Sequence, residues 1–228
     1  MITNRQLILP YAVPYLAYVG IASIPEEILP MEISYPLRLI VVPLLLAWGW
    51  RWYCPITGPR SKLGSIAIGI AAGLFGLVLW IALLAPYTTP SDTKPWSTSA
   101  FVFRLLSAGL VVPLFEELMM RGFVLRLALQ WDNLRKKYVN APLHRALDEH
   151  SINEVAPGAW SWAAVLISTL AFTAGHTTSE WPAAVAYGLL MALLWIKRQD
   201  LVACITAHAV TNVTLAWFVY ATGSWQYW

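Results

Sequence analysis

Long hydrophobic runs alternate with short polar connections along most of the 228 residues of the chain. A helix that crosses a membrane needs about 20 mostly apolar residues, because the hydrocarbon core is about 30 Å thick. Seven segments come close to this length: 7–24, 36–53, 63–86, 100–129, 160–176, 182–196 and 201–222. The pattern predicts an all-α polytopic membrane bundle of about seven (six to eight) transmembrane helices, built as one membrane-embedded domain over residues 1–228.

The composition supports a membrane protein, with 58% hydrophobic and only 12% charged residues. A soluble domain carries about twice that charged fraction. The net charge of +3 is small and dispersed, so we expect the lipid bilayer as a partner and no nucleic acid. Cys54 and Cys204 lie in separate apolar segments and form no C-x-x-C pair, which is typical of small packing residues.

The basic residues predict an orientation. Alternation of seven spans puts eleven of the 15 lysines and arginines on one side: Arg5, Arg51, Arg60, Lys62, Arg126, Arg135, Lys136, Lys137, Arg145, Lys197 and Arg198. By the positive-inside rule this side is cytoplasmic, with the N-terminus inside and the C-terminus outside. Glu26, Glu27, Glu32, Asp92 and Lys94 then lie outside. We expect the inner membrane of a bacterium or an archaeon.

Two features lie near the ends of the predicted spans. Nine tryptophans there are typical of anchors at the membrane interface: Trp48, Trp50, Trp52, Trp80, Trp96, Trp131, Trp160, Trp162 and Trp181. The polar connection 130–158 is loosely helical in its leucine spacing. It fits either an amphipathic segment on the inner leaflet or a solvated loop.

Three charged residues, Glu116, Glu117 and Arg121, lie inside the fourth hydrophobic segment. Each charge near the bilayer centre costs at least about 2.5–3.5 kcal/mol, so the group needs partners and usually marks a functional site. Glu117 and Arg121 are four residues apart and share a helix face, whereas Glu116 is rotated by about 100°. We expect Arg121 to neutralise Glu117, and Glu116 to point into a cavity. A buried ion pair that only locks helices together is the alternative. Pro113, one turn earlier, loosens the backbone.

Two further pairs of residues four apart lie on other spans. Phe172 and His176 end the fifth segment, and His208 and Asn212 lie within the seventh. Two histidines, an asparagine and a spare glutamate on three spans indicate a converging site. His176 falls at the outer end of its segment, but segments 160–176 and 182–196 are short. We therefore expect the turn from His176 to Trp181 to stop below the outer surface, in a protein-lined cavity.

These residues form three motifs in order: Glu-Glu-x-x-x-Arg (Glu116, Glu117, Arg121), Phe-x-x-x-His (Phe172, His176) and His-x-x-x-Asn (His208, Asn212). The set resembles the CPBP family of membrane proteins, the CAAX proteases and bacteriocin-processing enzymes, also called the Abi family. This family includes the Ras-converting CAAX endopeptidase. The resemblance covers about residues 100–222, which we expect to be the catalytic core.

The resemblance implies a glutamate-dependent intramembrane endopeptidase without cofactor, metal or covalent nucleophile. Glu116 is then the general base that activates water, and His176 helps to hold that water. His208 and Asn212 polarise the scissile carbonyl and stabilise its oxyanion. Glu117, Arg121 and Phe172 support the site.

Two other functions use the same residues. Glu116, His176 and His208 are legitimate ligands for a catalytic zinc ion, although no H-E-x-x-H motif occurs. A non-catalytic membrane scaffold, or a transporter with a proton or ion path through these groups, is the alternative outside enzymes. For the protease, we expect a peptide or protein substrate at the membrane that is lipid-anchored or otherwise membrane-associated. The sequence does not indicate whether the substrate is prenylated.

Overall fold

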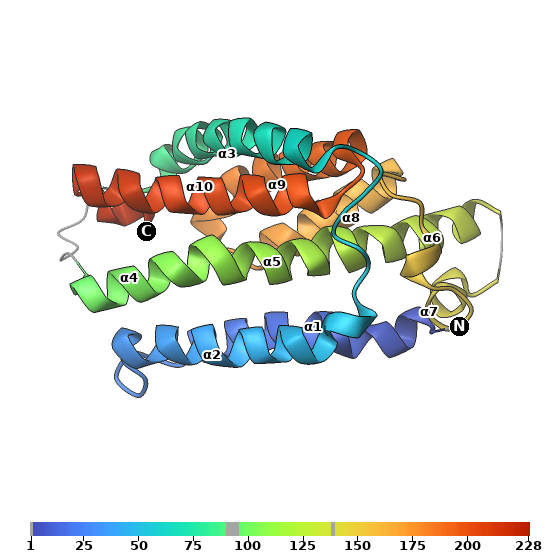
Figure 1. The fold of residues 1–228 in the computed structure, drawn as a ribbon, viewed down its shortest axis with the longest axis horizontal. Coiled ribbons are helices and arrows are strands. Elements are labelled where there is room, and N and C mark those ends of the chain that lie inside the picture. The colour runs from blue at the N-terminus through green and yellow to red at the C-terminus, as the bar shows by residue number, and fades with distance from the viewer. Residues whose placement is uncertain (1, 90–95, 138–139) are drawn as a thin grey trace.

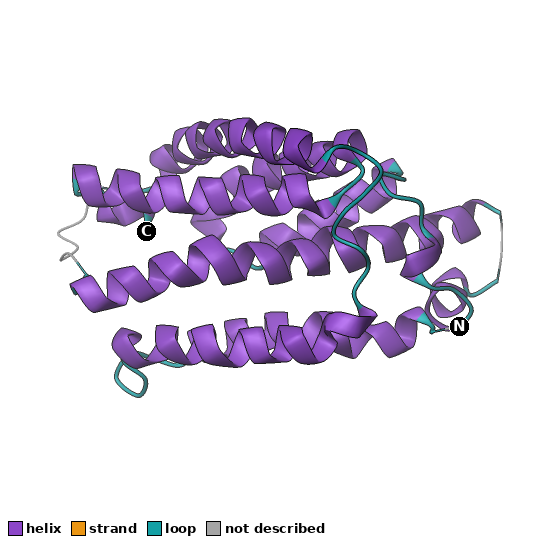
Figure 2. Ribbon diagram, viewed as in Figure 1, coloured by secondary structure: helices purple, strands orange, loops and turns teal. Residues whose placement is uncertain are grey.

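In the computed structural model, described for residues 2–89, 96–137 and 140–228, helices make up the architecture and no strand occurs in these ranges (Figures 1 and 2). The helices are α1 Asn4–Ala22, α2 Met31–Gly49, α3 Lys62–Leu84, α4 Thr98–Leu106, α5 Val112–Glu117, α6 Leu125–Lys136, α7 Pro142–Asp148, α8 Trp162–Ala174, α9 Trp181–Arg198 and α10 Leu201–Thr222. This confirms the predicted all-α membrane bundle.

The long helices run back and forth along one axis (Figure 1). The α1–α2 pair lies on one side of the continuous α4–α5–α6 stretch, and α3, α9 and α10 lie on the other. At one end, the N-terminus meets the connections that carry most of the basic residues: Asn4 N–H donates to the His150 carbonyl (2.9 Å), and Leu201 N–H to the Ile56 carbonyl (2.9 Å). At the opposite end, Ser97 donates to Glu32 (2.7 Å). Asp92 and Lys94 lie outside the described residues.

Five helices among the described residues are long and apolar enough to cross a membrane: Met31–Trp52, Lys62–Tyr87, Thr98–Lys136, Thr178–Arg198 and Leu201–Thr222. The protein is therefore a multi-pass membrane protein. The other two predicted spans correspond to α1 and α8, which are not among the five. Helix α8 has only 13 residues, and at 1.5 Å per residue it is about 20 Å long, shorter than the hydrocarbon core.

The stretch from Thr98 to Lys136 contains two π segments, Ser107–Val111 and Leu118–Val124. In the first, Val112 N–H bonds to the Ser107 carbonyl, five residues back. The next residue, Pro113, has no N–H to offer, so the Ala108 carbonyl lacks a helical partner. The side-chain amide of Asn212 donates to it instead (2.8 Å). Pro113 thus leaves one backbone carbonyl of its helix without a helical partner, and a side chain of the neighbouring helix α10 binds that carbonyl.

Glycines let α3 approach α10 closely. A Cβ atom on Gly73 would lie 2.6 Å from the Ala207 carbonyl oxygen, and one on Gly69 would lie 2.8 Å from the Ala203 carbonyl. The Thr211 hydroxyl donates to the Gly73 carbonyl (2.8 Å). Small residues at such contacts are the usual means of helix association in membranes. This contact fixes α10, which carries His208 and Asn212.

The polar connection after α6 folds onto the start of α1. The side chain of Asn4 is fully buried and donates to Gln130 (2.6 Å) and to the Ala146 carbonyl (2.8 Å). It also accepts a bond from Ile152 N–H (2.5 Å). Nearby, Arg5 pairs with Asp148 and holds the pKa of that carboxyl below its usual range. Gln130, Ala146, Asp148 and Ile152 therefore join the connection to the start of α1, while most of α7 stays exposed.

Candidate active site

Glu117 and Arg121 form a completely buried ion pair, with both side chains 0% exposed and the charged atoms 3.3 Å apart. Arg121 also donates to the Gly188 carbonyl on α9 (3.0 Å). The second partner of Glu117 is His208, whose Nδ1 lies 3.0 Å from the carboxylate. Since the carboxylate accepts, His208 Nδ1 carries the hydrogen. The pairing with Arg121 was expected from the spacing, whereas the bond to His208 was not.

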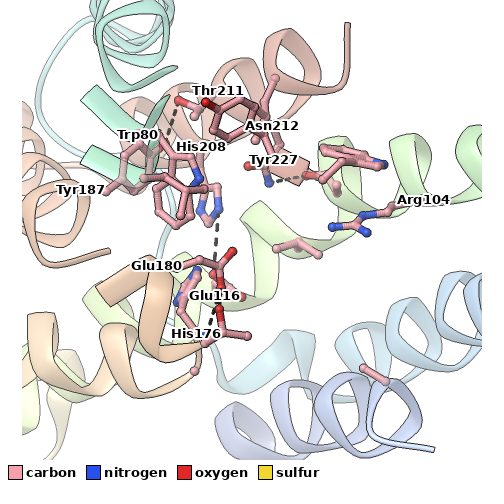
Figure 3. A pocket seen from close by; sticks show the side chains of 18 of the residues that line it. Trp80, Arg104, Glu116, His176, Glu180, Tyr187, His208, Thr211, Asn212 and Tyr227 are labelled. Carbon is pink, nitrogen blue, oxygen red and sulfur yellow. Dashed lines mark hydrogen bonds and ion pairs between the residues drawn. The ribbon is translucent and has the colours of Figure 1, made fainter. Parts of the chain in front are cut away.

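Glu116 differs from its neighbour because its side chain is 15% exposed and lines a cavity of about 610 Å³ (Figure 3). Its carboxylate lies 3.8 Å from His208 Nε2, the ring nitrogen opposite the one that Glu117 holds. The same cavity is lined by His176, His208 and Asn212. The structure therefore brings together the residues that the three motifs single out, on α5, after α8 and on α10.

His176 reaches this cavity because α8 is short and ends at Ala174. Its Nδ1 lies 2.9 Å from the Phe172 carbonyl, which can only accept, so this nitrogen carries the hydrogen. A short 3-10 turn, Thr178–Glu180, then leads into α9. Both His176 and Glu180 line the cavity. The turn thus lies against the cavity that contains Glu116.

Phe172 is the aromatic centre of the cluster and is almost completely buried. Its ring packs against His176 (4.6 Å between ring centroids) and His208 (6.2 Å). The Arg121 guanidinium lies 5.3 Å from the same ring. One apolar side chain therefore sets the spacing of the two imidazoles and shields the buried ion pair from the cavity.

Asn212 lines the cavity one turn after His208. One hydrogen of its side-chain amide is used by the Ala108 carbonyl at the first π segment. The other hydrogen has no protein partner among the described residues. Asn212 therefore joins α10 to the helix that carries Glu116 and still has one donor for a ligand.

Two aromatic residues of the site, Trp80 and Tyr187, were not predicted from the sequence to belong to it. Trp80 was expected to anchor the membrane interface, but its ring is buried and packs 5.4 Å from His176. Tyr187 packs 5.7 Å from His208, and its hydroxyl donates to Thr211 (2.9 Å). A tyrosine within the apolar α9 was a usable signal, because a buried phenol needs a partner. For Trp80 the sequence held no such signal, since its position near a segment end fits an anchor equally well.

The arrangement of possible metal ligands also bears on the zinc alternative. Within residues 2–89, 96–137 and 140–228, no three His, Cys, Asp or Glu side chains are grouped so that they could hold one metal ion. His176 and His208 each use Nδ1 for a hydrogen bond within the protein. Their Nε2 atoms, together with the carboxylates of Glu116 and Glu180, are the possible ligands on the cavity wall among the described residues.

A comparison with protein families matches residues 98–214 to the family described as type II CAAX prenyl endopeptidase Rce1-like. The match covers just over half of the chain and includes all three motifs. Searches of curated proteins and of solved structures return no match. The chain therefore belongs to the Rce1-like family of type II CAAX prenyl endopeptidases, within the CPBP group of intramembrane CAAX-type proteases.

Proposed function

We propose that the protein hydrolyses a peptide bond with a water molecule activated by Glu116. The observation that carries this proposal is the unequal environment of the two adjacent glutamates. Glu117 is sealed between Arg121 and His208, whereas Glu116 faces the cavity and has, among the described residues, no closer partner than His208 at 3.8 Å. A general base must reach water and substrate, and only Glu116 meets that requirement.

The proposed reaction begins with a water molecule between Glu116 and the scissile carbonyl. Glu116 takes a proton from this water as the oxygen forms a bond to the carbonyl carbon. The carbonyl electrons move to its oxygen, giving a tetrahedral oxyanion. When that intermediate collapses, the carbon–nitrogen bond breaks, and the leaving amine takes the proton from Glu116. His176 Nε2, left free by the bond from Nδ1 to Phe172, helps to hold the water.

His208 and Asn212 would stabilise the oxyanion. Glu117 holds the Nδ1 hydrogen of His208 and so directs Nε2 toward the cavity. Neutral His208 has only a lone pair at Nε2, and the imidazolium form places a donor there. The second amide hydrogen of Asn212 is the other donor. Fixed donors in a water-poor site contribute a large share of catalysis in acyl-transfer enzymes. Glu117 and Arg121 act as positioning residues.

The proposed substrate is a peptide or protein segment at the membrane that carries a lipid anchor, as the family implies. Its route to Glu116 follows from where the cavity lies. Two residues at one end of the bundle line the cavity together with Glu116: Ala22, which is exposed, and Thr88, which is half-buried. This end is opposite the basic connections. If those connections are cytoplasmic, the substrate reaches the site from the non-cytoplasmic face.

Labelling of single cysteines tests this orientation in intact cells of the host. Ser179→Cys, at the cavity, is expected to react with a membrane-impermeant maleimide added outside. Arg60→Cys, in the connection before α3, is expected to react only after the cells are lysed. The native Cys54 and Cys204 are buried and serve as the background control. The opposite labelling pattern would overturn the orientation without affecting the hydrolytic proposal.

Replacement of Glu116 tests the activity. Membrane proteomes of cells with the wild-type protein and with Glu116→Gln are compared for altered protein termini. Termini present with the wild type are expected to be missing with Glu116→Gln. Glu180→Gln is the matched control, because this carboxylate lines the same cavity but accepts bonds from Thr177 N–H (2.9 Å) and from its hydroxyl (2.8 Å). Unchanged termini with Glu116→Gln, at equal protein abundance, would contradict the role of the base.

A further inference from the structure

Helix α1 presents three tyrosines, Tyr11, Tyr15 and Tyr18, to the helix that carries Glu116. Their spacing of four and three residues puts them on one side of α1, and their rings pack against phenylalanines of that helix. The Tyr11 hydroxyl accepts a bond from Cys54 N–H (2.6 Å), and the Tyr18 hydroxyl accepts one from the Ser107 hydroxyl (3.3 Å). The half-buried Tyr15 differs, because its hydroxyl has no hydrogen-bond partner among the described residues.

Tyr15 lies between the residues that directly precede Glu116 and His176. Its ring packs edge-on against Phe115, with 5.9 Å between the ring centroids. Its hydroxyl meets Gly175, which lines the cavity, and a Cβ atom on Gly175 would overlap the hydroxyl oxygen. The unpartnered hydroxyl therefore lies at the wall of the cavity that contains Glu116.

The backbone of Gly175 does not itself require a glycine. Its φ angle of −80° lies in the right-handed helical region, which alanine adopts readily. Apart from the Tyr15 hydroxyl, the nearest atoms to a Cβ there are the Phe172 carbonyl oxygen at 3.4 Å and the Tyr15 ring carbon that bears the hydroxyl, at 3.6 Å. It is thus the Tyr15 hydroxyl that leaves no room for a side chain at Gly175.

Glu116 needs a hydrogen-bond donor that the motif residues do not supply in every state. It can act as a base only as a carboxylate, and a carboxylate in a water-poor cavity is costly without donors. Its partner at 3.8 Å, His208 Nε2, is a donor only in the imidazolium form. The charge of Glu116 acts on the Tyr15 phenol, so the two groups are near one another. The Tyr15 hydroxyl is therefore a donor within reach that is not used elsewhere in the described part of the chain.

We propose that Tyr15 is a positioning residue for the base and that its hydroxyl donates a hydrogen bond to one carboxylate oxygen of Glu116. The other oxygen is then directed at the attacking water and takes its proton, while the phenol keeps its own. This inference rests on the proposed function, because it assigns a partner to the proposed base. Tyr15 lies outside residues 98–214, which the family model matches, so α1 adds a residue to the site that the three motifs do not contain.

Tyr15→Phe tests this role, because it removes the hydroxyl and keeps the ring. The probe is a synthetic lipidated peptide with the sequence around a terminus found in the comparison of membrane proteomes. We expect kcat to fall about 10- to 100-fold, the range for a lost hydrogen bond to a charged group. KM should stay within about twofold, because Tyr15 acts through Glu116 rather than on the substrate. The thermal unfolding midpoint should stay at the wild-type value.

Tyr11→Phe is the matched control on the same face of α1. It leaves Cys54 N–H without its partner, so it should lower the unfolding midpoint while kcat of the folded protein stays at the wild-type value. The two tyrosines thus separate a structural hydroxyl from a positioning one.

Gly175→Ala displaces the Tyr15 hydroxyl without removing it and should lower both kcat and the unfolding midpoint. When Tyr15→Phe is added, the new Cβ has room, because the ring carbon lies 3.6 Å from it. The midpoint should then recover, while kcat stays as low as in Tyr15→Phe alone. Residues in contact commonly show such coupling. Recovery of kcat together with the midpoint would overturn the inference, because Tyr15 would then serve only to pack the two helices.

Wild-type kcat in Tyr15→Phe would also overturn the inference, as would a loss of activity that only follows the loss of folded protein. Glu116→Gln is measured with the same peptide to separate the two proposals. Cleavage that persists in Glu116→Gln contradicts the proposed function. Absent cleavage in Glu116→Gln, combined with wild-type kcat in Tyr15→Phe, contradicts the role of Tyr15 alone.

Discussion

Replacing either of the two adjacent glutamates with glutamine should affect the free energy of unfolding very differently. Glu117→Gln keeps the shape of the side chain but leaves the charge of Arg121 buried and unpaired. Removing one partner of a buried ion pair typically costs about 3–5 kcal/mol, and both side chains here are 0% exposed. Glu116→Gln breaks only a 3.8 Å contact at the edge of a cavity. We expect it to change the free energy of unfolding by less than about 1 kcal/mol, while abolishing cleavage.

A double replacement separates stability from chemistry. In Glu117→Gln with Arg121→Gln no unpaired charge remains, so the loss should be smaller than the sum of the two single losses. Residues in direct contact commonly show such coupling, and here we expect about 2 kcal/mol. The double variant should still not cleave the substrate, because His208 has lost the carboxylate that holds its Nδ1 hydrogen.

The free energy of unfolding can be measured by titrating SDS into mixed micelles, with tryptophan fluorescence as the signal. Cleavage of a lipidated peptide is followed on the same preparations. If Glu116→Gln destabilises the protein as much as Glu117→Gln does, the two glutamates do not differ in their contribution to stability, and the assignment of a structural role to Glu117 alone is wrong. Recovery of both stability and cleavage in the double variant would show that the ion pair only locks the helices together.

The remaining predictions concern packing and metal dependence. Gly73→Ala should destabilise the bundle by about 1–3 kcal/mol by overpacking, because its Cβ would meet a carbonyl oxygen at 2.6 Å. Gly20→Ala is the control, since nothing lies within 4 Å there; equal effects in the same unfolding titration would count against the close contact of α3 and α10. Asn4→Ala should cost about 1–3 kcal/mol, because it leaves Ile152 N–H and the Ala146 carbonyl without their partner; unaltered hydrogen exchange across residues 142–154 would contradict this. Cleavage should survive strong chelators, and loss of activity that zinc restores would instead support the zinc alternative.

The charged and polar residues of the candidate site could be found from the sequence because each is expensive in a membrane. Glu116, Glu117 and Arg121 stand out in an apolar segment, and helical spacing alone pairs the last two. The separation of roles between the glutamates also follows from that spacing. The bond between Glu117 and His208 joins residues 91 apart in the chain, and no local pattern encodes such a contact.

The rest depends on packing that hydrophobicity does not reveal. Trp80 is a tryptophan near the end of a hydrophobic segment, as interface anchors are, yet its side chain is buried at the site. The packing of α3 against α9 and α10 buries it there. Helix α1, predicted as a span, is long enough with 19 residues but is not among the five helices that are also apolar enough to cross a membrane. Its internal Pro10 and Pro14 make it irregular, and the Tyr53 hydroxyl donates to the Pro10 carbonyl (2.8 Å).

The first π segment has a rotational consequence for the helix that carries both Arg104 and Glu116. In a regular α-helix, twelve steps of about 100° end about 120° away around the axis. A π turn takes up one extra residue, which removes about 100° and leaves the two side chains on nearly the same side. If this turn became α-helical with no residue lost, Arg104 would rotate by about 100° relative to Glu116, whereas loss of a single residue from Ser107–Val111 would leave the two aligned. The wide turn therefore acts as an angular spacer that keeps Arg104 and Glu116, which both line the cavity, on nearly the same side of the helix although they are twelve residues apart.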